Sequence, residues 1–150
     1  MKPSNFILGY DDQRRTVLKV ADFGIARNLR HEMVETHRIR YSGTPGYMSP
    51  EQIRGELLTP ASDLYSLGCV FYELLLGRPV FPEARTDEQN EYHLRQEPIP
   101  IRSLRFHIPQ EIEELLKCLL AKDPRKRPSS AKQVKQYIDQ LIRGVRHDPK

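Results

Sequence analysis

The chain has 150 residues, of which 38% are hydrophobic and 29% charged, with a formal net charge of +4. This length fits one domain with a thin core, and two cysteines, Cys69 and Cys118, are too few for a disulfide framework or a zinc site. The longest apolar stretch, residues 64–76, is too short to span a bilayer, and residues 1–5 are not followed by the apolar segment of a signal peptide. We therefore expect a cytoplasmic protein without a membrane segment.

The first elements in chain order are two short β-prone runs, 6–8 and 16–20, which are separated by Gly9 and two aspartates. This pattern predicts a small hairpin. From Asp22 to about Ser49 the sequence is polar and contains several glycines, which predicts a long irregular segment. Loops of that length in compact domains are usually functional or disordered.

Four helices are predicted next, each with a proline or a capping box at its start: about 60–76, 86–95, 109–120 and 130–142. The first is apolar nearly all round, which predicts burial on most sides. Both cysteines lie in apolar helical runs, which predicts that they are buried. The fold class is therefore mainly α with a small β-hairpin.

The basic charge is concentrated at the C-terminal end. From Lys122 onward there are 9 basic and 3 acidic residues, a net +6, whereas residues 1–121 hold 15 basic and 17 acidic, a net −2. A basic end is one feature of nucleic-acid binding. Here the charges are dispersed and lack interleaved aromatic residues, so we interpret them as a solvated surface and expect no nucleic-acid partner.

Three short motifs occur in a fixed order: Lys-Pro-Ser-Asn at 2–5, Asp-Phe-Gly at 22–24 and Gly-Thr-Pro-Gly-Tyr-Met-Ser-Pro-Glu at 43–51. Each is weak alone, but together with Asp63 and the segment 123–128 they form a specific pattern. The pattern resembles the eukaryotic-type serine/threonine protein kinase family, and within it the C-terminal lobe. The resemblance extends from Met1 to about residue 141. The residues of the third motif are similar to those of the bacterial branch of the family.

This resemblance implies ATP-dependent phosphoryl transfer to serine or threonine in a protein substrate, with ATP and Mg²⁺ as cofactors. It implies catalytic roles for Lys2 and Thr44, metal and cofactor binding by Asn5 and Asp22, and an apolar floor for the adenine at Ile7. Oxygen ligands suit the hard Mg²⁺ ion, which neutralises the phosphates during transfer. Taken singly, Lys2 also fits a solvated lysine, Asn5 a turn asparagine and Asp22 a helix-capping aspartate, but the joint pattern favours the kinase roles.

Two further roles come from the same resemblance. Glu51 and Arg127 are expected to form an ion pair that ties the end of the long loop to the helical base. Asp63 is expected to hold the backbone of the catalytic loop, although an acid in a first helical turn is also favoured by the helix dipole alone.

One part of the family pattern, His-Arg-Asp-x-Lys-x-x-Asn, is incomplete, because the chain starts just after the position of the catalytic aspartate. The Gly-rich loop, the strand lysine and its glutamate partner are also not in this sequence. The first hypothesis is a partial kinase domain at 1–142 with a basic tail at 143–150, inactive as this fragment. The alternative is a non-catalytic kinase-like binding module, and whether this chain is itself an enzyme stays open.

Overall fold

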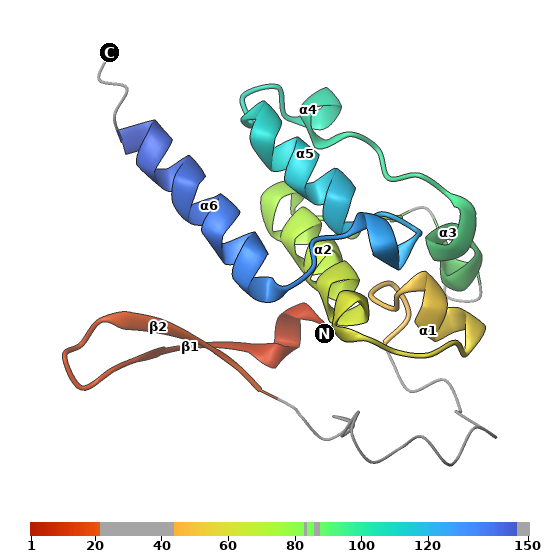
Figure 1. The fold of residues 1–150 in the computed structure, drawn as a ribbon, viewed down its shortest axis with the longest axis horizontal. Coiled ribbons are helices and arrows are strands. Elements are labelled where there is room, and N and C mark those ends of the chain that lie inside the picture. Colours follow the sequence, from red (N-terminus) through yellow and green to blue (C-terminus); the bar gives the residue numbers. More distant parts are fainter. Residues whose placement is uncertain (22–43, 83, 86–87, 147–150) are drawn as a thin grey trace.

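The computed structural model describes residues 1–21, 44–82, 84–85 and 88–146, with side chains up to residue 144. In this part a two-stranded ribbon is followed by a helical body (Figure 1). The elements are η1 (Pro3–Asn5), β1 (Phe6–Tyr10), β2 (Thr16–Val20), α1 (Pro50–Arg54), α2 (Pro60–Leu76), α3 (Gln89–Arg95), α4 (Ile101–Leu104), α5 (Gln110–Leu119), η2 (Pro124–Lys126) and α6 (Ala131–Arg146). The predicted fold class, mainly α with a β-hairpin, is confirmed.

The hairpin formed by β1 and β2 matches the prediction. The strands pair antiparallel in a register that places Phe6 opposite Val20 and Leu8 opposite Leu18. The ribbon extends away from α2 and α5 (Figure 1), and its side chains are largely open to solvent, with Leu8 72% and Leu18 60% exposed. The hairpin is therefore held mainly by its own strand pairing and leaves apolar surface uncovered.

Helix α2 is the centre of the helical body. At its start the Thr59 backbone N–H donates to Ser62 Oγ at 3.2 Å, and at its end Gly77 adopts a left-handed conformation with φ of 70°. Its most deeply buried side chains are Tyr65, Cys69, Val70 and Tyr72. The predicted burial is confirmed for most of the circumference, but Leu74 is 74% exposed, so one face remains open.

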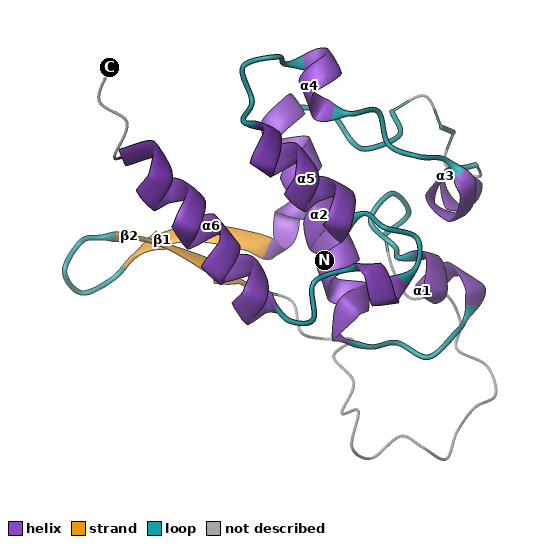
Figure 2. Cartoon of the chain, turned by 45° about the horizontal axis from the view of Figure 1, so that its top comes forward, coloured by secondary structure: helices purple, strands orange, loops and turns teal. Residues whose placement is uncertain are grey.

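Helices α2 and α5 pack against each other, and Figure 2 shows them crossing near the middle of the molecule. Gly68 makes this close approach possible, because a Cβ built there would lie 2.9 Å from Leu119 Cβ. Around the contact lie two apolar clusters, one with Tyr65, Tyr72, Phe81, Ile101 and Leu116, the other with Leu64, Leu115, Leu119 and Val134. This contact forms the hydrophobic core of the described chain.

The prediction that both cysteines are buried is wrong for one of them. Cys69 is 1% exposed, whereas Cys118 lies on the solvent side of α5 and is exposed. The run around Cys118 is apolar in sequence, but the helical period directs Leu115 and Leu119 to the core and turns position 118 away from it. An apolar neighbourhood in sequence is therefore not the same as an apolar neighbourhood in space.

The start of α6 differs in one detail from the predicted capping box. Ser130 Oγ accepts from the Gln133 backbone N–H at 3.2 Å, as expected. The Gln133 side chain instead accepts from the Ser129 backbone N–H at 2.7 Å, one residue before the predicted position. The capping box predicted at 86–89 involves residues outside the described part, but the helix that follows it ends at Arg95 as predicted.

The two short helices α1 and α4 were not predicted. They have five and four residues, too few for an apolar period to be visible in the sequence. Among the described helices, none combines the length and the apolar character that crossing a membrane requires.

Candidate functional site

The open end of the hairpin holds three of the predicted site residues. Asn5 is half-buried at the end of η1, and its backbone N–H donates to the Lys2 carbonyl at 3.0 Å. The Asn5 carbonyl accepts from the Ala21 N–H at 2.7 Å, which extends the β1–β2 pairing by one step. Ala21, the last described residue before Asp22, therefore lies beside Asn5, whereas Asp22 itself lies outside the described residues.

Ile7 lies on β1, two residues after Asn5 and opposite Lys19, and its side chain is 52% exposed. An exposed branched side chain next to Asn5 offers apolar surface to a flat ligand. The N-terminus lies near α2 (Figures 1 and 2).

The loop at residues 44–49, here called the docking loop, leads into α1. Thr44 is exposed, and its carbonyl accepts from the Tyr47 N–H at 3.2 Å in a tight turn. Gly46 within this turn has a φ of 92°, which favours glycine, and a Cβ there would lie 2.7 Å from Gln89 Oε1 of α3. The backbone conformation therefore favours glycine at this position, and a larger residue would also require the end of the Gln89 side chain to move.

Helix α2 holds the docking loop from the other side. The Tyr47 hydroxyl donates to Glu73 Oε2 at 2.5 Å, and Ser66 Oγ donates to the Tyr47 carbonyl at 2.7 Å. Burial, together with the Glu73 carboxylate, raises the pKa of Tyr47 well above its usual value, so the phenol remains a hydrogen-bond donor. The backbone next to Thr44 is thus fixed by the central helix.

The predicted meeting of Glu51 and Arg127 is confirmed, and the pair is buried. Arg127 donates two parallel hydrogen bonds to the Glu51 carboxylate, at 2.6 and 2.9 Å, and both side chains are at most 3% exposed. Arg127 also donates to the carbonyls of Ala61 and Ala121, each at 2.8 Å, and its guanidinium lies 4.9 Å from the centre of the Tyr65 ring. This arginine joins α1, the start of α2 and the segment before α6.

Burial disfavours the charged form of Glu51, but the hydrogen bonds from Arg127, the backbone and Ser62, together with the positive charge of Arg127, outweigh it, and the pKa of the carboxyl is lowered. The pair is therefore ionised at neutral pH.

A family model for the protein kinase domain matches residues 1–141. The chain belongs to the protein kinase family. It is 37% identical to serine/threonine-protein kinase A of Synechocystis over 99% of this chain and 29% of that protein. It is 35% identical to serine/threonine-protein kinase PknB of Mycobacterium leprae over 96% of this chain and 22% of that protein. It is also 33% identical to PknB of Mycolicibacterium smegmatis, over 99% and 23%.

These bacterial kinases confirm the resemblance to the eukaryotic-type serine/threonine kinase family. The chain spans less than a third of the length of each of these curated relatives.

The structure places the predicted kinase site residues in two groups. Lys2, Asn5 and Ile7 lie together at the open end of the hairpin, whereas Thr44 lies at the start of the docking loop. The segment that joins the groups, residues 22–43 with Asp22, lies outside the described part. Within the described part, no cluster of three His, Cys, Asp or Glu side chains could hold a metal ion.

The candidate metal ligands that the kinase resemblance implies are an amide and a carboxylate, Asn5 and Asp22. Both carry oxygen donors, so their chemistry fits Mg²⁺, whose remaining ligands would come from phosphate and water.

Sequence analysis did not identify two residues near the Tyr65 hydroxyl, His93 and Lys122. His93 on α3 is 1% exposed, although the segment 86–95 reads as a polar surface helix. Lys122 lies beside it, and its Nζ is 3.4 Å from the Tyr65 hydroxyl. No local pattern marks either residue, because their burial depends on contacts between segments far apart in the chain.

Proposed function

We propose that the chain is the C-terminal lobe of a bacterial serine/threonine protein kinase. In the intact enzyme it would take part in ATP-dependent phosphoryl transfer to serine or threonine of a protein. The partial kinase domain would span residues 1–142, followed by a basic tail at 143–150. The relatives, all named as serine/threonine kinases, support this assignment.

The observation that carries the proposal is the hydrogen bond from the Ala21 N–H to the Asn5 carbonyl. This bond places Ala21, the residue before Asp22, beside Asn5, which supports a shared site for the Asn5 amide oxygen and the Asp22 carboxylate. Mg²⁺ bound there would neutralise the negative charge of the ATP phosphates. Lys2 would place a positive charge at the transferred phosphate, and Ile7 would contact the adenine.

The docking loop would supply the other half of the site. We propose that Thr44 donates its hydroxyl to the catalytic centre and that the following residues contact the protein substrate. The contacts of Tyr47 with α2 support this role, since a preorganised loop loses little entropy when a peptide binds. Neither a catalytic aspartate in the family motif nor a Gly-rich phosphate loop is present in these 150 residues, so we expect the chain alone to be inactive.

The test uses the complete gene product that contains this chain, with γ-labelled ATP and a serine/threonine peptide. Asp22→Asn is expected to lower turnover at least 100-fold. Asp12→Asn, a matched change at the exposed hairpin turn, is expected to leave it unchanged. Equal activity of the Asp22 variant and the parent would refute the metal assignment. Turnover by the 150-residue chain alone would refute its inactivity.

The second candidate is a non-catalytic kinase-like binding module. The rigid attachment of the docking loop to α2, which does not involve the hairpin, favours it. A complete gene product that binds the peptide but transfers no phosphate would support this candidate over the first.

A further inference from the structure

The inference concerns a pocket between α2, the segment that follows α3, and α5. Its volume is about 310 Å³, at the lower end of the range of about 300–1,000 Å³ that is usual for small-molecule sites. Its apolar lining includes Tyr72, Pro98, Ile99, Ile101, Leu116 and Leu120. None of the lining residues is a predicted kinase site residue, so the pocket is separate from the site described above.

The pocket is buried at its base and open at its mouth. Tyr72, Ile101, Leu116 and Leu120 are at most 3% exposed, whereas Ile99 is 41% exposed. A ligand would therefore enter past Ile99 and place its apolar part against the four buried side chains. A cavity of about 150 Å³ accepts one benzene ring, so this pocket has room for a molecule with about two fused rings.

Two hydrogen bonds hold the walls of the pocket in place. The Tyr72 hydroxyl donates to the Ile99 carbonyl at 3.1 Å, which attaches the segment after α3 to α2. The Arg102 backbone N–H donates to Glu113 Oε2 at 2.9 Å, which attaches α4 to α5. These walls are therefore formed before a ligand binds, which lowers the entropy cost of binding.

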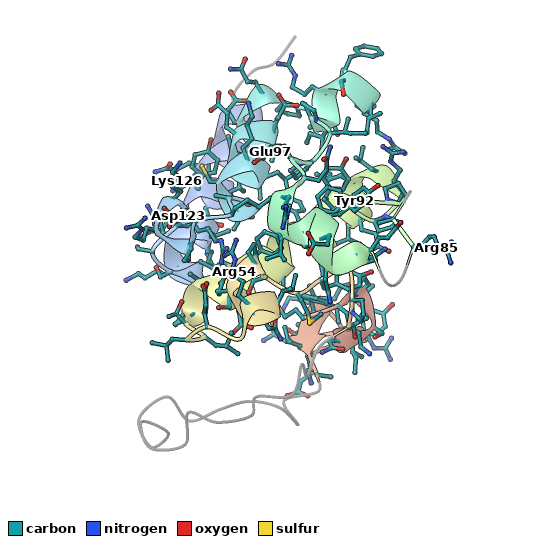
Figure 3. All side chains as sticks on the ribbon, turned by 90° about the vertical axis from the view of Figure 1, so that its right-hand side faces the viewer. Arg54, Arg85, Tyr92, Glu97, Asp123 and Lys126 are labelled. Carbon is teal, nitrogen blue, oxygen red and sulfur yellow. The ribbon has the colours of Figure 1, made fainter. Side chains whose placement is uncertain are left out.

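Three charged side chains also line the pocket. Glu97, labelled in Figure 3, belongs to the segment after α3, and Glu113 and Lys117 lie one turn apart on α5. Within the described residues, the side chains of Glu97 and Lys117 make no hydrogen bond or ion pair, and Glu113 uses one of its two oxygens for the Arg102 N–H. Two carboxylates and one ammonium give the lining a net charge of −1, which favours a cationic ligand.

We propose that this pocket binds a small, largely apolar amine. The apolar part lies against the four buried side chains, and the ammonium lies at the mouth, beside the carboxylates of Glu97 and Glu113. An anionic ligand would meet two like charges and have only Lys117 as a partner. The proposal does not rest on the kinase assignment, because it uses other residues and another face of the helical body.

The test is a ligand titration of the complete gene product that contains this chain, followed by nuclear magnetic resonance of ¹³C-labelled isoleucine, leucine and valine methyl groups. The probe is tryptamine, which has two fused rings and a primary amine. Tryptamine is expected to shift the methyl signals of Ile101, Leu116 and Leu120, and to leave Val134 of the other apolar cluster unchanged. For a ligand of this size we expect a dissociation constant of about 1 mM.

Two molecules of nearly the same shape test the role of charge. Tryptophol has a hydroxyl in place of the amine and is expected to bind about fivefold more weakly than tryptamine, as the loss of a partly exposed ion pair implies. Indolepropionate has a carboxylate there and is expected to bind more weakly still.

The variants Glu97→Gln and Glu113→Gln keep the shape of the two side chains and remove their charge. The double variant is expected to bind tryptamine and tryptophol equally well, because only the amine gains from the carboxylates. Glu111→Gln, at an exposed position of α5 that does not line the pocket, is the matched control and should keep the preference for the amine.

Three results would overturn the proposal. The first is unshifted methyl signals of Ile101, Leu116 and Leu120 at tenfold the expected dissociation constant, a measurement on the parent protein that requires no variant to fold. The second is tighter binding of indolepropionate than of tryptamine, and the third is a preference for the amine that survives in the double variant. None of these measurements requires phosphoryl transfer, so failure here is distinct from failure of the kinase assignment.

Discussion

Replacing Arg127 with leucine tests the buried ion pair most directly. The change removes both hydrogen bonds to Glu51 and leaves a carboxylate with a side chain only 3% exposed. It also removes donors from the carbonyls of Ala61 and Ala121. Breaking a buried pair by removing one partner typically costs about 3–5 kcal/mol. Because two carbonyls also lose a donor, we expect a loss near the upper end, about 5 kcal/mol.

That loss is comparable to the whole stability of a marginal domain, which is about 5–15 kcal/mol. The assay is urea unfolding followed by circular dichroism at neutral pH. Arg125→Leu is the matched control, because that arginine is 88% exposed and pairs with Asp123 on the surface, where solvent weakens the attraction; its loss should change stability far less than that of Arg127. The double variant Glu51→Met/Arg127→Leu should recover part of the loss, because no buried charge is then left without a partner. Equal effects of Arg127→Leu and Arg125→Leu would refute the reasoning.

Three further predictions concern burial and packing. Burial lowers the pKa of His93 to about 4 in the folded chain, whereas the usual histidine pKa is 6.5, so between these values the unfolded state binds more protons. The free energy of unfolding should therefore fall by up to about 3 kcal/mol as the pH is lowered from 6.5 to 4. In urea unfolding at several pH values, His93→Gln should lack this part of the pH dependence. A maleimide should label Cys118 alone in the native chain, because burial raises the pKa of the Cys69 thiol to about 12; two labels by mass spectrometry under native conditions would contradict this. Gly68→Ala should destabilise the chain by about 1–3 kcal/mol in urea unfolding, since its Cβ would meet the backbone-proximal Cβ of a leucine on α5.

Local signals in the sequence were sufficient for the hairpin and for α2. The hairpin is indicated by its β-prone runs, and α2 by the proline at its start and the glycine after its end. These signals act within a few residues, so they can be recognised from the sequence before the tertiary structure is known. The Glu51–Arg127 pair is different, since 76 positions separate its members and only the family resemblance related them. The positions of Lys2, Asn5 and Ile7 agree with one shared site, but their roles and that of Asp22 stay predictions.

The inward position of His93 could not be predicted, because it depends on where Tyr65 and Phe81 lie after the chain has folded. In the sequence, His93 stands in a polar segment that is typical of a surface helix. The wrong prediction for Cys118 has the opposite cause, since an apolar run was interpreted without regard to helical phase. In both cases the environment was set by tertiary packing rather than by neighbours in sequence.

The wide sequence separation of Glu51 and Arg127 also has a consequence for the order of folding. Closing a loop of 76 residues costs about 4 kcal/mol of chain entropy if nothing else has already brought its ends together. The residues of α2 and α5 that pack together are closer in sequence than Glu51 and Arg127, and they form the apolar core. Their packing can therefore bring Glu51 and Arg127 closer together before the ion pair forms. We therefore predict that the ion pair is a late contact, formed after the main barrier. Its removal should leave the refolding rate nearly unchanged and speed unfolding instead, so that Arg127 acts chiefly on the lifetime of the folded chain.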